Sequence, residues 1–421
     1  MITVSIDSIA AGGDGVGRHP DGRVVFVPRT SPGDIAEVRE VEQRQRYVRA
    51  SLVKVTEPGV GRAKPACPHY TRDGCGGCQL QHLTSEAQRD AKRRIVGDAL
   101  RRIGKVDVED PSIVPSPLEW RYRSKISMAV VAGSEPEQLT IGLHRHTRPQ
   151  QVFPLDDCLI VREPVMELWN AVRPHTHLLP RSLRSLVLRQ DREGFLHVVA
   201  IGSKPVAADR RDTRPWDAAP LAQAVGDATV SYWWAPWRGA GRIVAGPRNG
   251  FPALAFEQAN QDLAARIRRE AVESLGDVGQ KVVWDLYGGV GDTASLLLAR
   301  GAKVWTVDSD RAAKDWADRH NGPDVRRLVD SVENALHRLP APGAVVANPP
   351  RTGLGAPVAA WLNRWGSATP GVRLAYVSCD AATLARDLAR MPSLILRGVT
   401  AFDLFPQTSH VETLAVLESA S

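Results

Sequence analysis

The sequence predicts a protein of several domains: a small β-barrel, an α+β domain, and a doubly wound, mostly parallel α/β sheet. Three observations lead to this prediction. The chain has 421 residues, which is too many for a single hydrophobic core. Short Val-rich segments separated by Gly- and Asp-rich turns occupy its beginning. Strands alternate with helices in its final part, as in sheets whose strands run parallel.

Residues 1–57 are predicted to form the barrel. The segments "ITVSIDSIA" and "GRVVFVPRT" alternate or run apolar, and the loop between them, "AGGDGVGRHPDG", is rich in turn residues. A glycine-rich loop can also cradle phosphate when a helix follows it. No helix-like segment follows here, so we interpret these glycines as turns.

Residues 58–250 are predicted to form the α+β domain, with strand-like pieces such as "KISMAVVAG" and Pro-rich connections. The domain begins with "CPHYTRDGCGGCQLQH", which holds three cysteines and two histidines. A basic helix follows. Between Ala87 and Lys105 there are seven basic and two acidic residues, with Ile95, Ala99, Leu100 and Ile103 at helical spacing.

Charge and composition narrow the class of protein. The net charge of +7 suits either a mildly basic enzyme or a protein that binds a polyanion, and the basic helix favours the second. No apolar run is long enough to cross a membrane, and the first residues lack the pattern of a signal peptide, so we expect a cytoplasmic protein. In a reducing compartment, five cysteines ligate a metal or do chemistry more often than they form disulfides.

Residues 251–421 are predicted to form the α/β domain. The unit "VVWDLYGGVGDTASLLLARGAKVWTVD" reads as strand, loop, helix and strand, and Gly289, Gly291 and Ala294 fit the pattern G-x-G-x-x-A. Asp308 lies nineteen residues after Gly289, where an acid can bind ribose hydroxyls. The pattern suits a nicotinamide dinucleotide, S-adenosylmethionine or a plain tight turn. Asp285 favours S-adenosylmethionine, because the charged amino-acid end of that donor needs a carboxylate.

Three later motifs place reactive side chains at the ends of strands. Cys379 in "AYVSCD" precedes a helix, where a thiol pKa is lowered and the thiolate is a better nucleophile; an inert cysteine is the alternative. Asn348 in "VVANPPRTGLG" is either a rigid site residue or part of a strand terminator. Glu412 precedes the strand "LAVLE" and is either a general base or a surface carboxylate.

Taken together, these motifs resemble the RNA uracil-5-methyltransferases of tRNA and ribosomal RNA, the type with an N-terminal TRAM domain and an iron–sulfur cluster. The resemblance covers nearly the whole chain and follows the order of the family. It rests on the small barrel and on the segments "CPHYTRDGCGGCQLQH", "FEQAN", "DLYGGVGD", "NPPRTGLG", "YVSCD" and "LFPQTSHVETLAVL".

The resemblance implies the role of each domain. Residues 1–57 would be an OB-like TRAM barrel that binds RNA, and residues 58–250 an iron–sulfur and RNA-binding domain. Residues 251–421 would be a Rossmann-like S-adenosylmethionine-dependent methyltransferase domain. The helix over about residues 81–104 would pack on that catalytic domain although it precedes the central one.

The resemblance also implies the site residues. Cys379 would be the nucleophile that attacks carbon 6 of a uracil, and Glu412 would remove the carbon-5 proton after methyl transfer. Phe256 would lie near the donor and the target base. The S-adenosylmethionine site would contain Gln258, Tyr287, Gly289, Gly291, Asp308 and Asn348. The partner would be tRNA or large, 23S-type ribosomal RNA, with the target base out of its stack, and we expect a monomer.

The cysteine motif admits four devices: a disulfide, a redox pair, a zinc site and an iron–sulfur cluster. The reducing compartment disfavours the disulfide, and no thioredoxin-like unit surrounds Cys75 and Cys78. Zinc would use three cysteines with His69 or His82. The resemblance instead implies a 4Fe–4S cluster, with the ligands Cys67, Cys75, Cys78 and Cys158.

Two features depart from the family. Asn348 stands where the family has Asp, which removes a charge from the site. The gap between Cys67 and Cys75 is longer than in the usual patterns. A second hypothesis follows: a catalytically impaired RNA-binding protein that retains the fold, in which Asn348→Asp would restore methyl transfer. A nicotinamide oxidoreductase is a third, and it leaves Cys379 and Glu412 unexplained.

Overall fold

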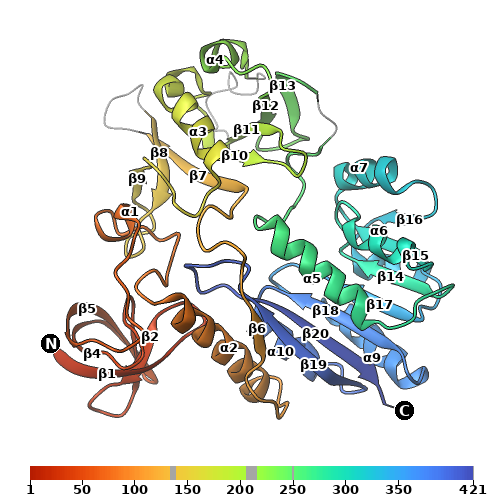
Figure 1. Ribbon diagram of the computed structural model, residues 1–421, viewed down its shortest axis with the longest axis horizontal. Helices are drawn as coiled ribbons and strands as arrows, with labels where there is room; N and C mark the ends of the chain where they lie inside the picture. Colours follow the sequence, from red (N-terminus) through yellow and green to blue (C-terminus); the bar gives the residue numbers. More distant parts are fainter. Residues whose placement is uncertain (133–138, 205–215, 249–250, 421) are drawn as a thin grey trace. The chain divides into compact units, whose positions relative to one another are not determined.

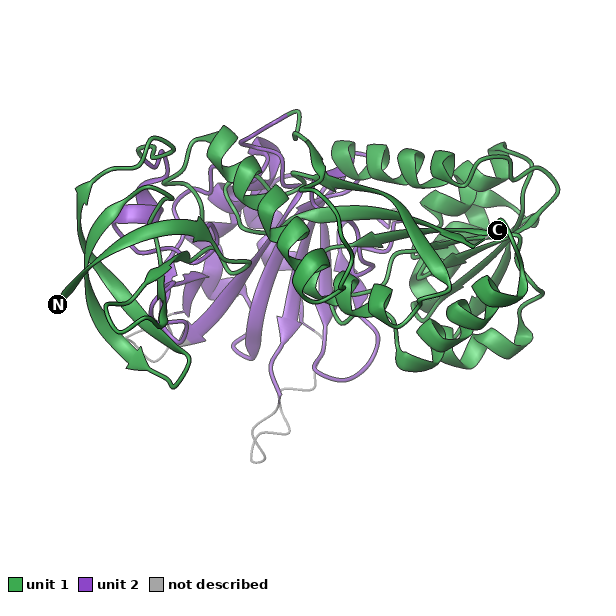
Figure 2. Ribbon diagram, turned by 90° about the horizontal axis from the view of Figure 1, so that it is seen from below, with its two compact units in different colours: residues 1–64, 79–117, 262–421 green, residues 65–78, 118–261 purple. Residues whose placement is uncertain are grey.

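The computed structural model describes residues 1–132, 139–204, 216–248 and 251–420, and these form two compact units. Figure 2 distinguishes them by colour: one holds residues 1–64, 79–117 and 262–421, and the other holds residues 65–78 and 118–261. The sequence-predicted boundary at residue 250 falls on residues 249–250, which lie outside the described residues. The division into three domains at 57 and 250 stays a prediction.

The chain begins with a closed five-stranded barrel, as predicted. Around the barrel the strands follow the order β1-β2-β3-β5-β4, and their bounds are β1 (Ile2–Ile9), β2 (Gly15–Arg18), β3 (Val24–Val27), β4 (Ile35–Gln43) and β5 (Tyr47–Glu57). Small aliphatic side chains fill the interior because alternate residues of each strand point inward. They are Val4, Ile6, Val25, Val27, Ala36, Val38, Val48 and Ala50.

An eight-stranded sheet forms the centre of the same unit (Figure 1). Its order is β16 (Arg326–Val329), β15 (Lys303–Asp308), β14 (Val282–Leu286), β17 (Ala344–Ala347), β18 (Arg373–Ser378), β20 (Glu412–Ser419), β19 (Leu394–Phe402) and β6 (Ser112–Val114). The strands from β16 to β18 are parallel, whereas β20 is antiparallel to both of its neighbours. The predicted doubly wound sheet is therefore confirmed, with an antiparallel extension.

Helices cover both faces of this sheet, so its strands are apolar on both sides. Trp284 and Leu286 of β14 pack in one core with α2, α9 and α10, while Val283 packs in a second core with α5 and α6. The helix bounds are α2 (Ser85–Arg102), α5 (Gln261–Ser274), α6 (Asp292–Ala299), α7 (Arg311–Asn321), α8 (Val332–Ala335), α9 (Ala356–Ala368) and α10 (Ala381–Ala389), with a 3-10 turn at Leu336–Arg338.

Helix α2 is shorter than the range suggested by the sequence. It begins after Thr84, whose side-chain oxygen accepts a hydrogen bond from the backbone N–H of Ala87. Its apolar face, with Ala91, Ile95, Val96 and Leu100, packs in the same core as α10. The helical spacing predicts Ile103 on this face, but its side chain is 45% exposed because the helix has ended by then.

The second unit contains a seven-stranded sheet of order β13-β12-β11-β10-β7-β8-β9. Neighbours are antiparallel except β11 and β12. The strand bounds are β7 (Lys125–Ala132), β8 (Leu139–His144), β9 (Val152–Pro154), β10 (Leu183–Gln190), β11 (Leu196–Gly202), β12 (Ser231–Ala235) and β13 (Arg242–Ala245). The helices are α1 (Pro68–Thr71), α3 (Glu163–Val172) and α4 (Ala219–Val225), with a 3-10 helix at Arg173–Leu178.

No described helix combines the length and the apolar character that a membrane crossing needs.

Candidate active site

Neighbouring strands bring Cys379 and Glu412 to one edge of the sheet. The antiparallel register of β18 and β20 pairs Arg373 with Glu418 and, at its end, Ser378 with Thr413. Cys379 directly follows Ser378, the last residue of β18, and Glu412 directly precedes Thr413 as the first residue of β20. Residues opposite each other on antiparallel strands have side chains within contact range. The strand pairing thus brings two residues that lie 33 apart in sequence to the same end of β18 and β20, close enough for the charge of Glu412 to act on the Cys379 thiol.

The electrostatics of this pair differ from the expectation. Burial, and then the negative charge of Glu412, raise the pKa of the Cys379 thiol, so the lowered pKa predicted from its position before α10 is wrong for the protein without substrate. Glu412 is only 1% exposed, and burial raises the pKa of its carboxyl to about 8. The Oε2 atom of Glu412 has no hydrogen-bond partner among the described residues.

Arg351 is a cation close to Cys379 and Glu412, and it was not among the site residues predicted from the sequence. Its charge lowers the pKa of both Cys379 and Glu412. The loop that carries it is fixed to α10: the Oδ2 atom of buried Asp387 accepts hydrogen bonds from the backbone N–H of Leu354 (2.8 Å) and from the hydroxyl of Tyr376 (2.8 Å). The sequence signal that could have indicated Arg351 is its position directly after the "NPP" motif.

The segment before Glu412 is fixed by helix α2. The side-chain amide of Gln88 donates to the side-chain oxygen of Gln407 (3.0 Å), and its oxygen accepts from the backbone N–H of Gln407 (2.8 Å). Lys92, which is fully buried, forms an ion pair with Asp403 and donates to the backbone oxygen of Phe405 (3.0 Å). Lys92 therefore does not belong to the basic outer face expected for this helix.

The predicted donor residues Asp308, Tyr287 and Asn348 end the neighbouring strands β15, β14 and β17 at the same edge. Leu286 pairs with Ala347, and the backbone N–H of Asn348 donates to the Leu286 oxygen (3.2 Å). The backbone N–H of Gly289 donates to Asp308 Oδ2 (2.9 Å), which ties the loop to that acid. Gly289 (φ +51°) and Gly291 (φ +87°) have the left-handed conformations that favour glycine.

Carboxylates gather around this loop. Asp285 is buried, and burial together with the charges of Asp308 and Asp292 raises its pKa to about 7, while Arg327 lowers it. Its Oδ2 atom has no hydrogen-bond partner among the described residues. Several acids at the end of a strand suit a positively charged ligand better than a pyrophosphate, which needs free N–H groups and no opposing carboxylate.

The remaining predicted donor residue, Gln258, is half-buried and belongs to the second unit, in which a buried ion pair holds its segment. Arg189 donates to Glu257 Oε2 (2.5 Å) and to the backbone oxygen of Ala253 (2.7 Å). The aromatic ring of Phe256 in the same segment is 71% exposed.

The four cysteines of the predicted cluster all belong to the second unit. Cys67, Cys75 and Cys78 are buried and Cys158 is half-buried. Burial, and then negative charge on Cys78 and on Cys75, raise the pKa of the Cys158 thiol, which shows that these sulfur atoms interact although 80 residues separate Cys78 from Cys158. No three Cys, His, Asp or Glu side chains of the described ranges are arranged as a metal site.

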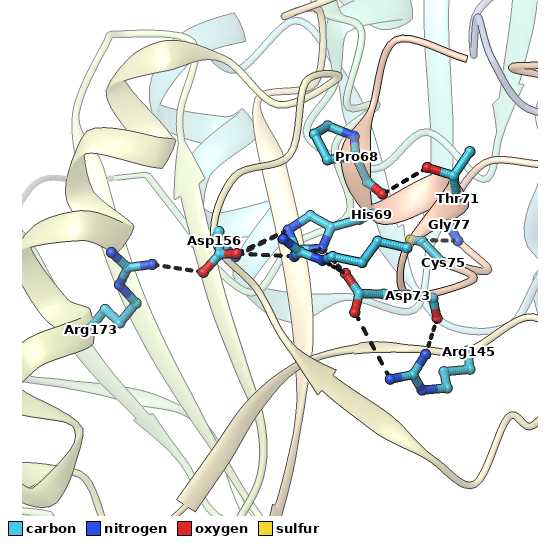
Figure 3. A network of polar contacts seen from close by, with 10 residues as sticks. Pro68, His69, Thr71, Asp73, Cys75, Gly77, Arg145, Asp156 and Arg173 are labelled. Atoms are coloured by element: carbon cyan, nitrogen blue, oxygen red, sulfur yellow. Dashed lines mark hydrogen bonds and ion pairs between the residues drawn. The ribbon is translucent and has the colours of Figure 1, made fainter. Parts of the chain in front are cut away.

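Both histidines considered for zinc have structural partners. Figure 3 shows His69 between two aspartates: Nδ1 donates to Asp73 Oδ2 (2.6 Å), and Nε2 accepts from the backbone N–H of Asp156 (3.3 Å). His82 is buried with Nε2 2.9 Å from the backbone oxygen of Thr30. Burial lowers its pKa to about 4. These contacts occupy both imidazoles and disfavour a Cys₃His zinc site.

Comparison with known proteins agrees with this architecture. Residues 1–53 match the TRAM domain family. The predicted barrel is therefore a TRAM domain.

The relatives narrow the class. The chain is 31% identical to an "Uncharacterized RNA methyltransferase" of Nitratidesulfovibrio vulgaris, over 99% of this chain and 96% of that relative. It is 30% identical to the "23S rRNA (uracil(1939)-C(5))-methyltransferase RlmD" of Azoarcus sp., over 99% of this chain and all of that one. The chain belongs to the RNA uracil-C5-methyltransferase family, and the oxidoreductase and impaired-binder hypotheses are not favoured.

Among solved structures, the Pyrococcus abyssi tRNA (uracil-54, C5)-methyltransferase in complex with S-adenosyl-L-homocysteine has the same fold. Its TM-score is 0.70 at 23% identity, and the match covers 99% of this chain and all of that one.

Proposed function

We propose that this protein transfers a methyl group from S-adenosylmethionine to carbon 5 of a uridine in RNA through a covalent bond to Cys379. The observation that carries the proposal is that Cys379 directly follows β18 at the end where the paired strand β20 begins with the buried Glu412, whose charge acts on the Cys379 thiol. A nucleophile and a proton acceptor on one side of a pocket are what this reaction needs.

The chemistry assigns one task to each side chain. The Cys379 thiolate adds to carbon 6 of the uracil, and the ring becomes an enolate whose carbon 5 is nucleophilic. S-adenosylmethionine supplies the methyl group for carbon 5. Glu412 then removes the remaining carbon-5 proton, the double bond re-forms, and the thiolate leaves carbon 6.

The charges of the pair set the order of ionisation. An ionised Glu412 opposes formation of the Cys379 thiolate, whereas Arg351 favours it. Formation of the carbon–sulfur bond removes the thiolate charge. Glu412 can then lose its proton beside Arg351 and act as the base.

The donor would bind at the glycine loop. Asp285 and Asp308 would face its positive amino-acid end and its ribose hydroxyls, and the glycines would let it approach the backbone. Tyr287 and Asn348 would complete the pocket, and the role of Gln258 in donor binding stays a prediction. Asn348 keeps the shape of an aspartate and can donate as well as accept a hydrogen bond.

The test combines product analysis with trapping. The parent protein is incubated with labelled S-adenosylmethionine and unmodified tRNA or large ribosomal RNA, and the nucleosides are analysed. We expect 5-methyluridine with the parent and none with Cys379→Ala. Glu412→Gln should form the covalent RNA adduct but release it slowly. Unchanged product with Cys379→Ala would refute the mechanism.

The four cysteines would hold a 4Fe–4S cluster, for which their thiolates are the usual ligands. Burial of Cys67, Cys75 and Cys78 in one unit supports this assignment, whereas the described side chains are not arranged as a metal site. Iron and sulfide analysis of the anaerobically purified protein tests it, with Cys158→Ser as the variant that should lose iron. Stoichiometric zinc without iron would contradict it.

The relatives named above act on ribosomal RNA and on tRNA, and both remain candidate substrates of this chain. Mapping the modified nucleotide in each RNA decides between them. The expected monomer and cytoplasmic location stay predictions.

A further inference from the structure

The second unit contains a cavity that the proposed chemistry does not use. It lies at the ends of the neighbouring strands β10 to β13 (Figure 1). Its volume is about 530 Å³. This volume is within the range of roughly 300–1,000 Å³ typical of ligand sites. Its lining residues are Ser182, Gly202, Ser203, Lys204, Trp234, Pro236, Trp237, Arg238, Ala240 and Arg242.

Two tryptophans give the cavity an aromatic surface. Trp234 is 4% exposed and forms part of the wall, while Trp237 is 44% exposed at the rim. A Cβ at Gly202 would approach the Trp234 ring to 3.0 Å, so the glycine leaves that part of the indole uncovered. The guanidinium of Arg184 lies 5.6 Å from the centre of the Trp237 ring. A large indole this exposed presents a flat face for another ring.

The charged lining residues are all cations. Lys204, Arg238 and Arg242 line the cavity, and no carboxylate of the described residues does. Among the residues that the structure describes, none of these three forms an ion pair. The arginines of helix α2 contrast with them, because Arg94 pairs with Asp90 and Arg101 pairs with Asp98 and Asp110. The cavity is therefore the better electrostatic match for a polyanion.

We propose that this cavity binds an unpaired nucleotide of the RNA substrate other than the methylated uridine. The base would stack on Trp237, and the adjacent phosphates would contact Arg238 and Arg242. Stacking on an exposed aromatic ring beside cations is how proteins hold single-stranded RNA. The inference rests on the proposed function only in taking RNA as the partner, and it identifies a second contact with that RNA.

The first experiment measures binding of the full-length chain to a nine-nucleotide single-stranded oligouridine that carries 4-thiouridine, without S-adenosylmethionine. Trp237→Ala should weaken binding about five- to 150-fold, the range that loss of one stacked base gives. Trp237→Phe retains a ring and should recover most of the affinity. Near-ultraviolet crosslinks should map to residues 234–242. Equal affinity of Trp237→Ala and the parent would overturn the proposal.

The second experiment separates phosphate contacts from general charge. Arg238→Ala with Arg242→Ala should reduce the slope of log affinity against log salt by about 1.4, since each neutralised phosphate of a single strand contributes roughly 0.7 to that slope. The matched control, Arg364→Ala with Arg397→Ala, removes two exposed arginines from α9 and β19 and should leave the slope unchanged. Equal slopes for both double variants would refute the phosphate contacts.

Oligouridine binding tests the cavity, and formation of 5-methyluridine tests the proposed reaction, so the failure of one can be told from the failure of the other. Loss of 5-methyluridine with intact oligouridine binding would reject the proposed reaction and leave the cavity assignment standing. With the natural RNA, Trp237→Ala should raise KM and leave kcat unchanged, because Trp237 is not among the catalytic side chains. An unchanged KM would overturn the assignment to the substrate RNA.

Discussion

Glu412→Gln should stabilise this protein at high pH while it slows turnover. The carboxyl is buried, and burial raises its pKa from 4.5 to about 8. Between these two values the folded protein binds more protons than the unfolded chain, so stability falls as the pH rises through this window. Below pH 4.5 the carboxyl is neutral in both states and there is no penalty.

The magnitude follows from the two pKa values. Each factor of ten in an ionisation constant is about 1.4 kcal/mol, so ionised Glu412 costs the fold about 5 kcal/mol above pH 8. Glutamine has the same shape and no charge, and it removes this cost. For a unit of this size the variant should melt roughly 10 °C higher than the parent at pH 8.5.

The assay is thermal unfolding of parent and variant at pH 5 and pH 8.5. The difference in melting temperature should be small at pH 5 and large at pH 8.5. Glu418→Gln is the matched control, since Glu418 lies on the same strand but is partly exposed and pairs with Arg373. A difference between Glu412→Gln and the parent that does not change with pH would refute the reasoning.

Three further predictions concern the same unit. Because the ionised carboxylate of Glu412 raises the pKa of Cys379, Glu412→Gln should accelerate alkylation of this thiol by iodoacetamide at pH 9, where Glu412 is ionised, and an unchanged rate would contradict the coupling. Gln88→Ala removes two buried hydrogen bonds to Gln407 and should lower the free energy of unfolding by about 1–3 kcal/mol. It should also lower kcat more than it raises KM. Arg94→Ala, on the exposed side of the same helix, should change neither stability nor kinetics. Gly288→Ala would place a Cβ 2.1 Å from Thr306 Oγ1 and 2.5 Å from Asp285 Oδ2, and calorimetry should therefore show weaker binding of S-adenosylhomocysteine. The control variant Gly398→Ala has open space around its Cβ and should bind S-adenosylhomocysteine as the parent does.

Local sequence patterns were sufficient to predict strands where hydrophobic periodicity and turn residues agree. The barrel strands alternate, and β14, β15, β17 and β18 are short apolar runs that end at glycine or polar residues. Strand β6 was not predicted, because three residues carry too little periodicity. Strand β19 was not predicted either, since only part of "LILRGVTAF" is buried and its pattern breaks at a bulge near Gly398.

The candidate site residues were also predicted only in part from the sequence. Cys379, Glu412, Asp308 and the glycines were selected from motifs, since their residue types and strand-end positions suffice to suggest the chemistry. Arg351, Gln88 and Asp387 were not selected as site residues, because each acts through a partner that lies far away in sequence.

The sequence by itself therefore determined which reactive groups this protein carries and the fold that presents them. The tertiary structure decided how these groups influence one another. The pairing of β18 with β20 brings Cys379 and Glu412 to the same end of these strands, and the surrounding core removes water from the carboxyl. A helix N-terminus lowers a thiol pKa only when burial and a nearby carboxylate do not outweigh it. That balance depends on distances between side chains on different strands, which local sequence does not encode.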